Sequence, residues 1–394
     1  MNRLNLLFSS YIFVIVGLFL YSFTQVDLSL TLSRNAFIHS LEKSIQHVGY
    51  FNRPLSTLVF LVIIALLTTH YLIFVYLALK NKINTTQIWI LIIGTTAILT
   101  LSYNAFSYDL FNYIFDAKLI TFYHVNPYQY RALDFPREPM LSFMHWSHRT
   151  YPYGPFWLVM TVPFSFLGLN LFIPTLFIFK ALISATFLAT VYLIQKIARE
   201  INPKREKFIL VTFALSPFVL IEAVLDSHND MPMMMFAVLS IYLALKKRWL
   251  LSVIAVILSA LTKQATVFMV IPVILYVVSE VFKKRIISFE NFLKFCILSM
   301  TIALIYVVSR IDIQPWYFLW VFPLIILLKP NKYIFLTVTG FSIGLLLRYS
   351  PFLYRGDWNG LVPTIELYAT IFSTLIGFLS ALILDIYRLS KQKA

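Results

Sequence analysis

Long apolar runs alternate with short polar segments along the whole chain. Several runs reach about 20 residues, the length that a helix needs to cross the hydrocarbon core of a bilayer. The pattern predicts an all-α, polytopic membrane bundle of about 12 transmembrane helices. The predicted spans are Leu6–Phe23, Leu55–Leu79, Gln87–Asn104, Leu169–Gln195, Phe208–Val224, Met231–Leu245, Leu250–Leu261, Val267–Val281, Phe292–Val308, Trp316–Leu328, Tyr333–Leu347 and Leu361–Ile386.

Some segments differ from a simple span. Phe156–Gly168 is apolar but short, which predicts a half-crossing or interfacial helix. Leu250–Leu261 and Val267–Val281 are short as well, so the break between them, at Lys263, is expected near a membrane face. The longest stretch between spans, Ala105–Pro155, is expected to hold short helices along the membrane surface.

Composition agrees with a membrane protein. The chain has 394 residues, of which 60% are hydrophobic and 12% are charged, about half of the ~25% charged residues in a soluble domain. We expect a single integral membrane domain over residues 1–394: three N-terminal spans (1–105), an outer catalytic loop (106–155) and the remaining bundle (156–394). The one cysteine, Cys296, excludes an intramolecular disulfide and a cysteine-based metal site.

The charges predict an orientation. The net charge is +15, but the basic residues form short clusters between apolar runs, which argues against a nucleic-acid partner. With the N-terminus inside, the inner loops hold 20 of the 32 Lys and Arg residues, as the positive-inside rule requires. Acidic residues concentrate on the other side. We therefore predict a multi-pass plasma-membrane protein with both termini cytoplasmic and its polar chemistry on the extracytoplasmic face.

Two carboxylates stand just after an apolar run, in the segment Ser107–Tyr128. On a continuing helix, Asn112 and Tyr113 would share one face with Asp109 and Asp116. A carboxylate at such a boundary can act as a general base toward a hydroxyl group. The alternative is structural: Asp109 caps an interfacial helix, and the neighbouring aromatic residues form a membrane belt.

A second polar motif, Asp226-Ser-His-Asn-Asp230, lies at an outer helix junction. Its two aspartates are four residues apart and could point at one ligand. Together with His228 they could hold a divalent cation or a hydroxyl-rich sugar. The alternative is a cap by Asn229 or Asp230 for a helix that starts near Met231, which leaves Asp226 and His228 unexplained.

A proline-rich motif marks the return of the chain to the membrane. Tyr151-Pro-Tyr-Gly-Pro155 predicts a rigid turn, with Tyr153 available to contact a substrate.

Three outer cations could stabilise an anionic leaving group such as a lipid phosphate. They are Lys263, Arg310 and Arg348. Each could instead snorkel or pair with an acid. Lys263 is the preferred candidate because apolar sequence flanks it on both sides.

Taken in order, these motifs resemble the GT-C superfamily of glycosyltransferases, which use polyprenyl- or dolichyl-phosphate sugars. The nearest likeness is to polyprenol-phosphate-mannose-dependent mannosyltransferases of the alpha-1,6 type. The resemblance runs from Tyr108 to about Trp320. It is carried by Asp109 with Tyr113, Asn126-Pro-Tyr128, Tyr153-Gly-Pro155, His228-Asn-Asp230, Lys263, and Gln314-Pro-Trp-Tyr317 with Trp320.

The chain departs from the family pattern in two respects. It has two additional spans before the outer loop. It also lacks a paired Asp-Asp or Asp-Glu at the first motif, which leaves the choice between Asp109 and Asp116 open.

The resemblance implies an inverting transfer of a hexose, most simply mannose, from a polyprenyl-phosphate donor to a glycan, glycolipid or protein acceptor. Asp109 matches the base, with Asp116 as the competing candidate. The second motif would bind donor phosphate or a metal, Mg²⁺ or Mn²⁺, through Asp226, His228 and Asp230. The expected substrate- and donor-binding residues are Tyr113, Asn126, Tyr153, Asp226, His228, Asn229, Asp230, Lys263, Arg310, Gln314, Trp316, Tyr317 and Arg348.

Two other functions fit the same features. One is a non-enzymatic transporter or lipid-linked glycan flippase, although the interior charges are few, chiefly Lys180 and Glu222, and repeated halves are not evident. The other is an O-antigen ligase or polymerase, which would transfer a whole glycan.

Overall fold

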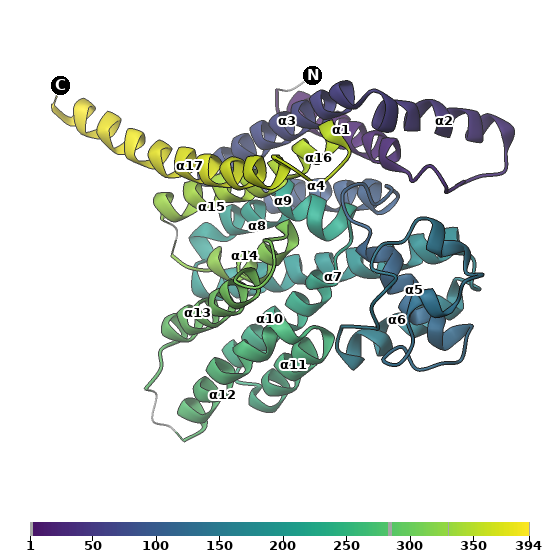
Figure 1. Cartoon of the computed structure of the whole chain (residues 1–394). Coiled ribbons are helices and arrows are strands. Elements are labelled where there is room, and N and C mark those ends of the chain that lie inside the picture. Colours follow the sequence, from purple (N-terminus) through teal and green to yellow (C-terminus); the bar gives the residue numbers. More distant parts are fainter. Residues whose placement is uncertain (1–2, 283–285, 330, 394) are drawn as a thin grey trace.

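The computed structural model describes residues 3–282, 286–329 and 331–393, and the regular elements in these ranges are all helical (Figure 1). The α-helices are α1 (Arg3–Ser22), α2 (Ala36–Phe51), α3 (Arg53–Leu79), α4 (Thr85–Thr100), α5 (Asp109–Thr121), α6 (Pro155–Leu167), α7 (Phe172–Ile201), α8 (Glu206–Ala214), α9 (Pro217–Val219), α10 (Asp230–Leu245), α11 (Trp249–Thr262), α12 (Val267–Val281), α13 (Phe289–Val308), α14 (Phe322–Ile325), α15 (Lys332–Leu347), α16 (Tyr349–Arg355) and α17 (Val362–Lys393). The other helical turns are η1 (Phe23–Gln25), η2 (Ala132–Asp134), η3 (Pro139–Ser142), η4 (Pro203–Arg205), the π-helix η5 (Leu220–Leu225), η6 (Gln264–Thr266) and η7 (Pro315–Trp320).

The helices confirm a polytopic all-α bundle. Among the described residues, seven helical segments are long and apolar enough to cross a membrane, or eight if the bent pair Pro203–Ala214 and Pro217–Leu225 forms one span. The others are Arg3–Gln25, Arg53–Leu79, Phe172–Ile201, Gln264–Val281, Phe289–Val308, Lys332–Arg355 and Val362–Tyr387. The remaining apolar helices are shorter, so the count of twelve spans stays a prediction.

Two predicted spans differ from the structure, each at a proline. Phe208–Val224 is bent by 46° between α8 and α9, because Pro217 has no N–H to donate and disfavours helical geometry at Ser216. Trp316–Leu328 is not a single spanning helix. It consists of η7 followed by the four-residue α14, which has Pro323 in its first turn.

The expected interruptions elsewhere are confirmed. The segment predicted as a half-crossing or interfacial helix forms α6, a short helix of 13 residues with Pro163 inside it. α11 ends at Thr262 and η6 begins at Gln264, so Lys263 lies at a break between helices. α2 was not predicted from the sequence. It starts after Asn35, whose side chain accepts hydrogen bonds from the first turn of the helix.

The four chain segments that carry polar chemistry come together on one side of the bundle. They are the start of α5, the turn from η5 to α10, the break between α11 and α12, and η7. α10 packs against η7 and α11, η5 packs against η7, and α5 packs against α6 and α7 (Figure 1). α7 packs against α5, α10 and η5 and so holds three of these segments together.

Candidate active site

The predicted helix after the first apolar runs is present as α5. Its polar stripe is buried, and Asp109 lies in the first turn, where the helix dipole favours a negative charge. Burial raises the pKa of Asp109, and the nearby cations Lys263 and Arg149 oppose this shift. Burial also raises the pKa of Asp116 to about 8, and the positive charge of Arg149 opposes this shift. The N-cap residue is Tyr108, and its side chain makes no capping hydrogen bond.

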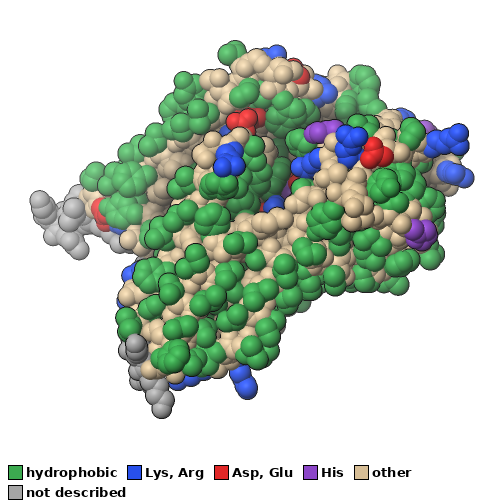
Figure 2. All heavy atoms as spheres, turned by 60° about the horizontal axis from the view of Figure 1, so that its bottom comes forward, with side chains coloured by type: hydrophobic (Ala, Val, Ile, Leu, Met, Phe, Trp, Pro, Cys, Tyr) green, Lys and Arg blue, Asp and Glu red, His purple; other side chains and the backbone are tan. Residues whose placement is uncertain are grey.

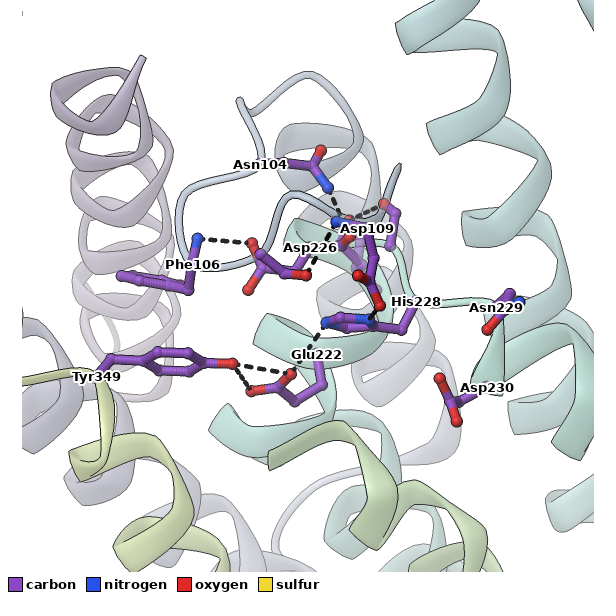
Figure 3. A network of polar contacts seen from close by, with 12 residues as sticks. Asn104, Phe106, Asp109, Glu222, Asp226, His228, Asn229, Asp230 and Tyr349 are labelled. Atoms are coloured by element: carbon purple, nitrogen blue, oxygen red, sulfur yellow. Dashed lines mark hydrogen bonds and ion pairs between the residues drawn. The ribbon is translucent and has the colours of Figure 1, made fainter. Parts of the chain in front are cut away.

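The turn from η5 to α10 orients the second motif. Ser227 has φ +55°, a left-handed conformation that non-glycine residues rarely adopt. Such strain persists only where surrounding structure enforces it and is common at functional sites. Across this residue the flanking side chains diverge: Asp226 turns toward Phe106, and His228 turns toward Asp109 (Figure 3).

His228 is the centre of a chain of buried polar groups (Figure 3). Its Nδ1 lies 3.8 Å from Oδ2 of Asp109, and its Nε2 lies 3.5 Å from Oε2 of Glu222. The hydroxyl of Tyr349 donates to Glu222 at 3.1 Å. The ring of His228 stacks on Trp316, with centroids 4.1 Å apart. Burial lowers the pKa of His228 well below its usual value, so the ring is neutral and one nitrogen is free to accept.

Asp230 forms a buried ion pair with Lys263. The ammonium donates to both carboxylate oxygens at 2.8 and 2.9 Å and to Oδ1 of Asn229 at 3.3 Å. The indole N–H of Trp320 donates to the same carboxylate at 2.5 Å. Three aromatic rings surround the ammonium at 5.6–5.9 Å: Tyr153, Tyr317 and Trp320. Asn229 is the N-cap residue of α10, but its side chain makes no capping bond, so the capping alternative does not hold.

Asp226 does not point at the same space as Asp230. Its Oδ1 accepts a hydrogen bond from the backbone N–H of Phe106 at 3.1 Å, and its carbonyl accepts one from Asn104 at 2.5 Å. The buried ammonium of Lys180 donates to Asn104 at 3.2 Å. Asp226 therefore fixes the loop that leads into α5, and so helps to set the position of Asp109.

The turn Tyr151–Pro155 docks against the end of α11. The N–H of Gly154 donates to the carbonyl of Thr262 at 3.2 Å. A Cβ at Gly154 would lie 2.0 Å from the carbonyl oxygen of Leu261, so only glycine permits this approach. The turn thereby sets Tyr153 beside Lys263, which follows Thr262 directly.

Four predicted site residues have other contacts. Asn126 is exposed, and its side chain closes a local turn at the N–H of Tyr128. Arg310 is exposed and stacks on Tyr306, 4.4 Å from the ring centroid. Arg348 pairs with Glu366 at 2.8 Å. Gln314 occupies the N-cap position of η7 without a side-chain cap. Within the described ranges, none of the four shares a hydrogen bond with the cluster around Lys263.

Other residues of the cluster were missed by sequence reasoning. Glu222 and Tyr349 extend the chain of polar contacts beyond His228, and Arg149 and Trp146 act on Asp109 from the outer loop. Glu222 did carry a signal, because an ionisable residue inside an apolar run usually has a function. The other three look like ordinary loop or interface residues.

The chain offers one set of metal-ligand atoms within the described ranges. Glu222, Asp226 and His228 each contribute an atom, and these atoms lie within 4.8 Å of one another. Oδ2 of Asp226 and both ring nitrogens of His228 are buried without a hydrogen-bond partner, which is costly unless another ligand satisfies them. These residues fit a divalent cation. This set contains Glu222, whereas the sequence suggested Asp230 as the third candidate ligand.

One face of the molecule has a hollow. Figure 2 shows a face covered largely by hydrophobic side chains, with acidic, basic and histidine side chains gathered around a hollow. Charged groups around a hollow in an apolar surface are expected where a polar substrate meets a membrane protein.

The comparisons with known proteins identify a family. The model of the MptA_B family, alpha-(1->6)-mannopyranosyltransferase, N-terminal domain, matches residues 11–279, well over half of the chain. No curated protein and no solved structure matches the chain. The match begins at residue 11 and so covers most of the N-terminal region before the outer loop. The chain therefore belongs to the alpha-(1->6)-mannopyranosyltransferase family and is a membrane glycosyltransferase of the mannosyltransferase type.

Proposed function

We propose that this protein transfers a mannosyl residue from a polyprenyl-phosphate donor to a hydroxyl of a glycan, glycolipid or protein acceptor. The transfer takes place on the extracytoplasmic face. The observation that carries the proposal is the convergence of Asp109, His228, Asp230 and Lys263 in one cluster at the ends of membrane helices. A site at the membrane boundary gives access both to a lipid-linked donor and to a water-soluble acceptor.

Asp109 is the proposed general base. It lies beside His228 and is close enough to Lys263 for that charge to lower its pKa. Burial makes its carboxylate a stronger base once ionised. Asp116 is less suited to the role, because a pKa of about 8 keeps it protonated at neutral pH.

The proposed reaction is a single displacement. The acceptor hydroxyl attacks the anomeric carbon while Asp109 takes its proton, and the bond from that carbon to the phosphate oxygen breaks. The geometry is that of an inverting glycosidase with a sugar hydroxyl in place of water. The lipid phosphate leaves with the electron pair as an anion, next to the ammonium of Lys263. The proton on Asp109 is then released to water.

We also propose that Glu222, Asp226 and His228 hold a divalent cation. Their mixed oxygen and nitrogen donors suit Mn²⁺ or Zn²⁺ better than Mg²⁺. Each ligand has an outer partner: Tyr349 for Glu222, the N–H of Phe106 for Asp226, and Asp109 for His228. The ion, when bound, would neutralise the buried carboxylates.

Metal analysis of the purified protein tests this site. We expect about one divalent ion per chain by elemental mass spectrometry, since the site offers a single set of ligands. The double variant Glu222→Gln/Asp226→Asn should lose it. Glu138→Gln, a buried acid paired with Lys118, is the matched control and should keep it. Equal metal content in all three proteins would exclude the site.

The transfer reaction itself can be tested with membranes that contain the parent chain. We expect incorporation of label from polyprenyl-phosphate-[¹⁴C]mannose into an α-mannoside acceptor, because the family is mannosyltransferase and the cluster pairs a base with a cation. Membranes without the protein are the control. Absence of transfer from every lipid-phosphate monosaccharide would exclude the proposal, and transfer of a preassembled glycan would favour the ligase or polymerase alternative. Family membership already favours an enzyme over a transporter.

A further inference from the structure

Lys180 is a lysine in the interior of the bundle, on α7, and it is fully buried. A cation inside a membrane protein is costly to bury, and such a residue usually has a function and a specific partner. Neither the proton transfer nor the metal site proposed above uses Lys180. Its role therefore has to follow from its contacts.

The ammonium of Lys180 lies at the end of η5. It donates hydrogen bonds to the backbone carbonyls of Val224, at 3.4 Å, and of Leu225. These carbonyls belong to the last turn of the π-helix, where carbonyl groups lack partners within the helix and the helix dipole favours a cation. A third hydrogen bond goes to Oδ1 of Asn104 at 3.2 Å. The three acceptors account for the three N–H groups of an ammonium, so the geometry fits the charged form of the lysine.

Asn104 links Lys180 to the second polar motif. Its side-chain amide donates to the carbonyl of Asp226 at 2.5 Å, and the N–H of Phe106 donates to the carboxylate of Asp226 at 3.1 Å. Figure 3 shows Asn104 and Phe106 beside Asp226. The turn after η5 is therefore held from two sides, because Lys180 binds the carbonyls that precede it and Asn104 binds the carbonyl of its first residue.

This turn contains the strained backbone of the site. Ser227 has φ +55°, and a non-glycine residue keeps such a conformation only where surrounding contacts enforce it. The hydroxyl of Ser227 donates at 2.8 Å to the carbonyl of Val224, which Lys180 also binds. The hydrogen bonds of Lys180 thus act on the backbone that decides where Asp226 and His228 point.

We propose that Lys180 is a positioning residue for the transfer reaction. It holds the left-handed turn between η5 and α10, and through that turn it sets the directions of Asp226 and His228. It acts through backbone carbonyls and through Asn104. An apolar side chain of similar length would fill the same space but would leave these acceptors unbound, so the turn could relax. This inference rests on the proposed function.

Hydrogen exchange followed by mass spectrometry measures the turn directly and does not depend on activity. Lys180→Met keeps the length of the side chain and removes all three hydrogen bonds. Asn104→Ala keeps the lysine and removes only the link to the turn, so it tests the proposal even if Lys180→Met fails to fold. In both variants, the amides of residues 104–108 and 226–229 should exchange about tenfold faster or more, because hydrogen bonds to a charged group are lost and the segment opens locally.

Ser184→Ala is the matched control. Ser184 lies one turn from Lys180 on α7 and accepts a hydrogen bond from Thr100 of α4 at 2.7 Å. The variant therefore loses a bond between α4 and α7 but keeps the three bonds of Lys180, and exchange in the two segments should match that of the parent chain. Exchange at the parent rate in Lys180→Met and Asn104→Ala would overturn the proposal. An equal increase in Ser184→Ala would also overturn it, because any loss of packing along α7 would then loosen the turn.

Steady-state kinetics distinguishes positioning from a general loss of structure. Lys180→Met should lower kcat about 10–100-fold, the usual effect of residues that orient metal ligands from outside, with the KM for polyprenyl-phosphate-mannose unchanged. The double variant Lys180→Met/Asn104→Ala should lose less than the product of the two single effects, because both residues hold the same turn. An unchanged kcat in Lys180→Met, or a change confined to KM, would reject the positioning role. Absence of transfer by the parent chain would count against the proposed function, whereas the exchange experiment would still decide whether Lys180 holds the turn.

Discussion

Replacing Asp109 by Asn is expected to reduce mannosyl transfer by about 10²–10⁴-fold, the usual contribution of a general base. The change removes the proton acceptor but keeps the shape of the side chain. Apart from His228 at 3.8 Å, the carboxylate has few strong contacts to lose, so the fold should remain intact. The measurement is the initial rate of label transfer from polyprenyl-phosphate-mannose, with thermal unfolding recorded in parallel.

Asp134→Asn is the matched control for this prediction. Asp134 is another outer-loop carboxylate, but it pairs with Arg131 at an exposed position. We expect this variant to keep its transfer rate. A rate within tenfold of the parent in Asp109→Asn would reject Asp109 as the base. A large loss in Asp116→Asn with a preserved rate in Asp109→Asn would assign the role to Asp116 instead.

The parts of the site that follow from local periodicity could be predicted from the sequence. The spacing of Asp109, Tyr113 and Asp116 requires only that the helix continue, and α5 does. The position of Lys263 follows from two apolar runs that are too short to span the membrane alone. Both predictions depend on neighbours in the chain, which is the information that a single sequence carries best.

The parts that depend on one backbone angle could not be predicted. Asp226 and Asp230 are four residues apart, a spacing that on a helix would place both carboxylates on one side. The left-handed Ser227 interrupts the helix and sends Asp226 to the loop before α5. Serine does not indicate this conformation, so the sequence grouped Asp230 with Asp226 and His228, whereas in the structure the acid that lies near both is Glu222.

Contacts between segments that are far apart in the sequence could not be predicted either. Arg348 looked like a free outer cation, but Glu366 in α17 neutralises it. The hydroxyl of Tyr349 donates a hydrogen bond to Glu222, which is 127 residues away in the sequence. The apolar run Trp316–Leu328 looked like a span, yet η7 turns its aromatic residues toward His228 and Lys263. Such contacts are set by how the helices pack.

Removing the charge of Lys263 should affect stability and transfer separately. Lys263→Met leaves the buried Asp230 carboxylate with Trp320 and no counter-charge, and breaking one side of a buried pair costs about 3–5 kcal/mol. The double variant Lys263→Met/Asp230→Asn removes both charges and should recover most of that stability. Its transfer rate should nevertheless stay about 10–100-fold below the parent, because the lost cation also contributed a charge-assisted hydrogen bond of ~1.5–3 kcal/mol to the departing phosphate.

The Lys118–Glu138 pair provides the matched control for this cycle. It has the same 2.8 Å separation, and its lysine and acid are buried to a similar degree, with 16% and 1% of each side chain exposed against 14% and 0% for Lys263 and Asp230. Lys118→Met should also lower the unfolding temperature, and Lys118→Met/Glu138→Gln should restore both stability and transfer. If Lys263→Met/Asp230→Asn likewise regains full transfer, Lys263 serves only to balance Asp230. If transfer stays low while stability returns, the Lys263–Asp230 pair takes part in transfer and does not serve only to stabilise the fold.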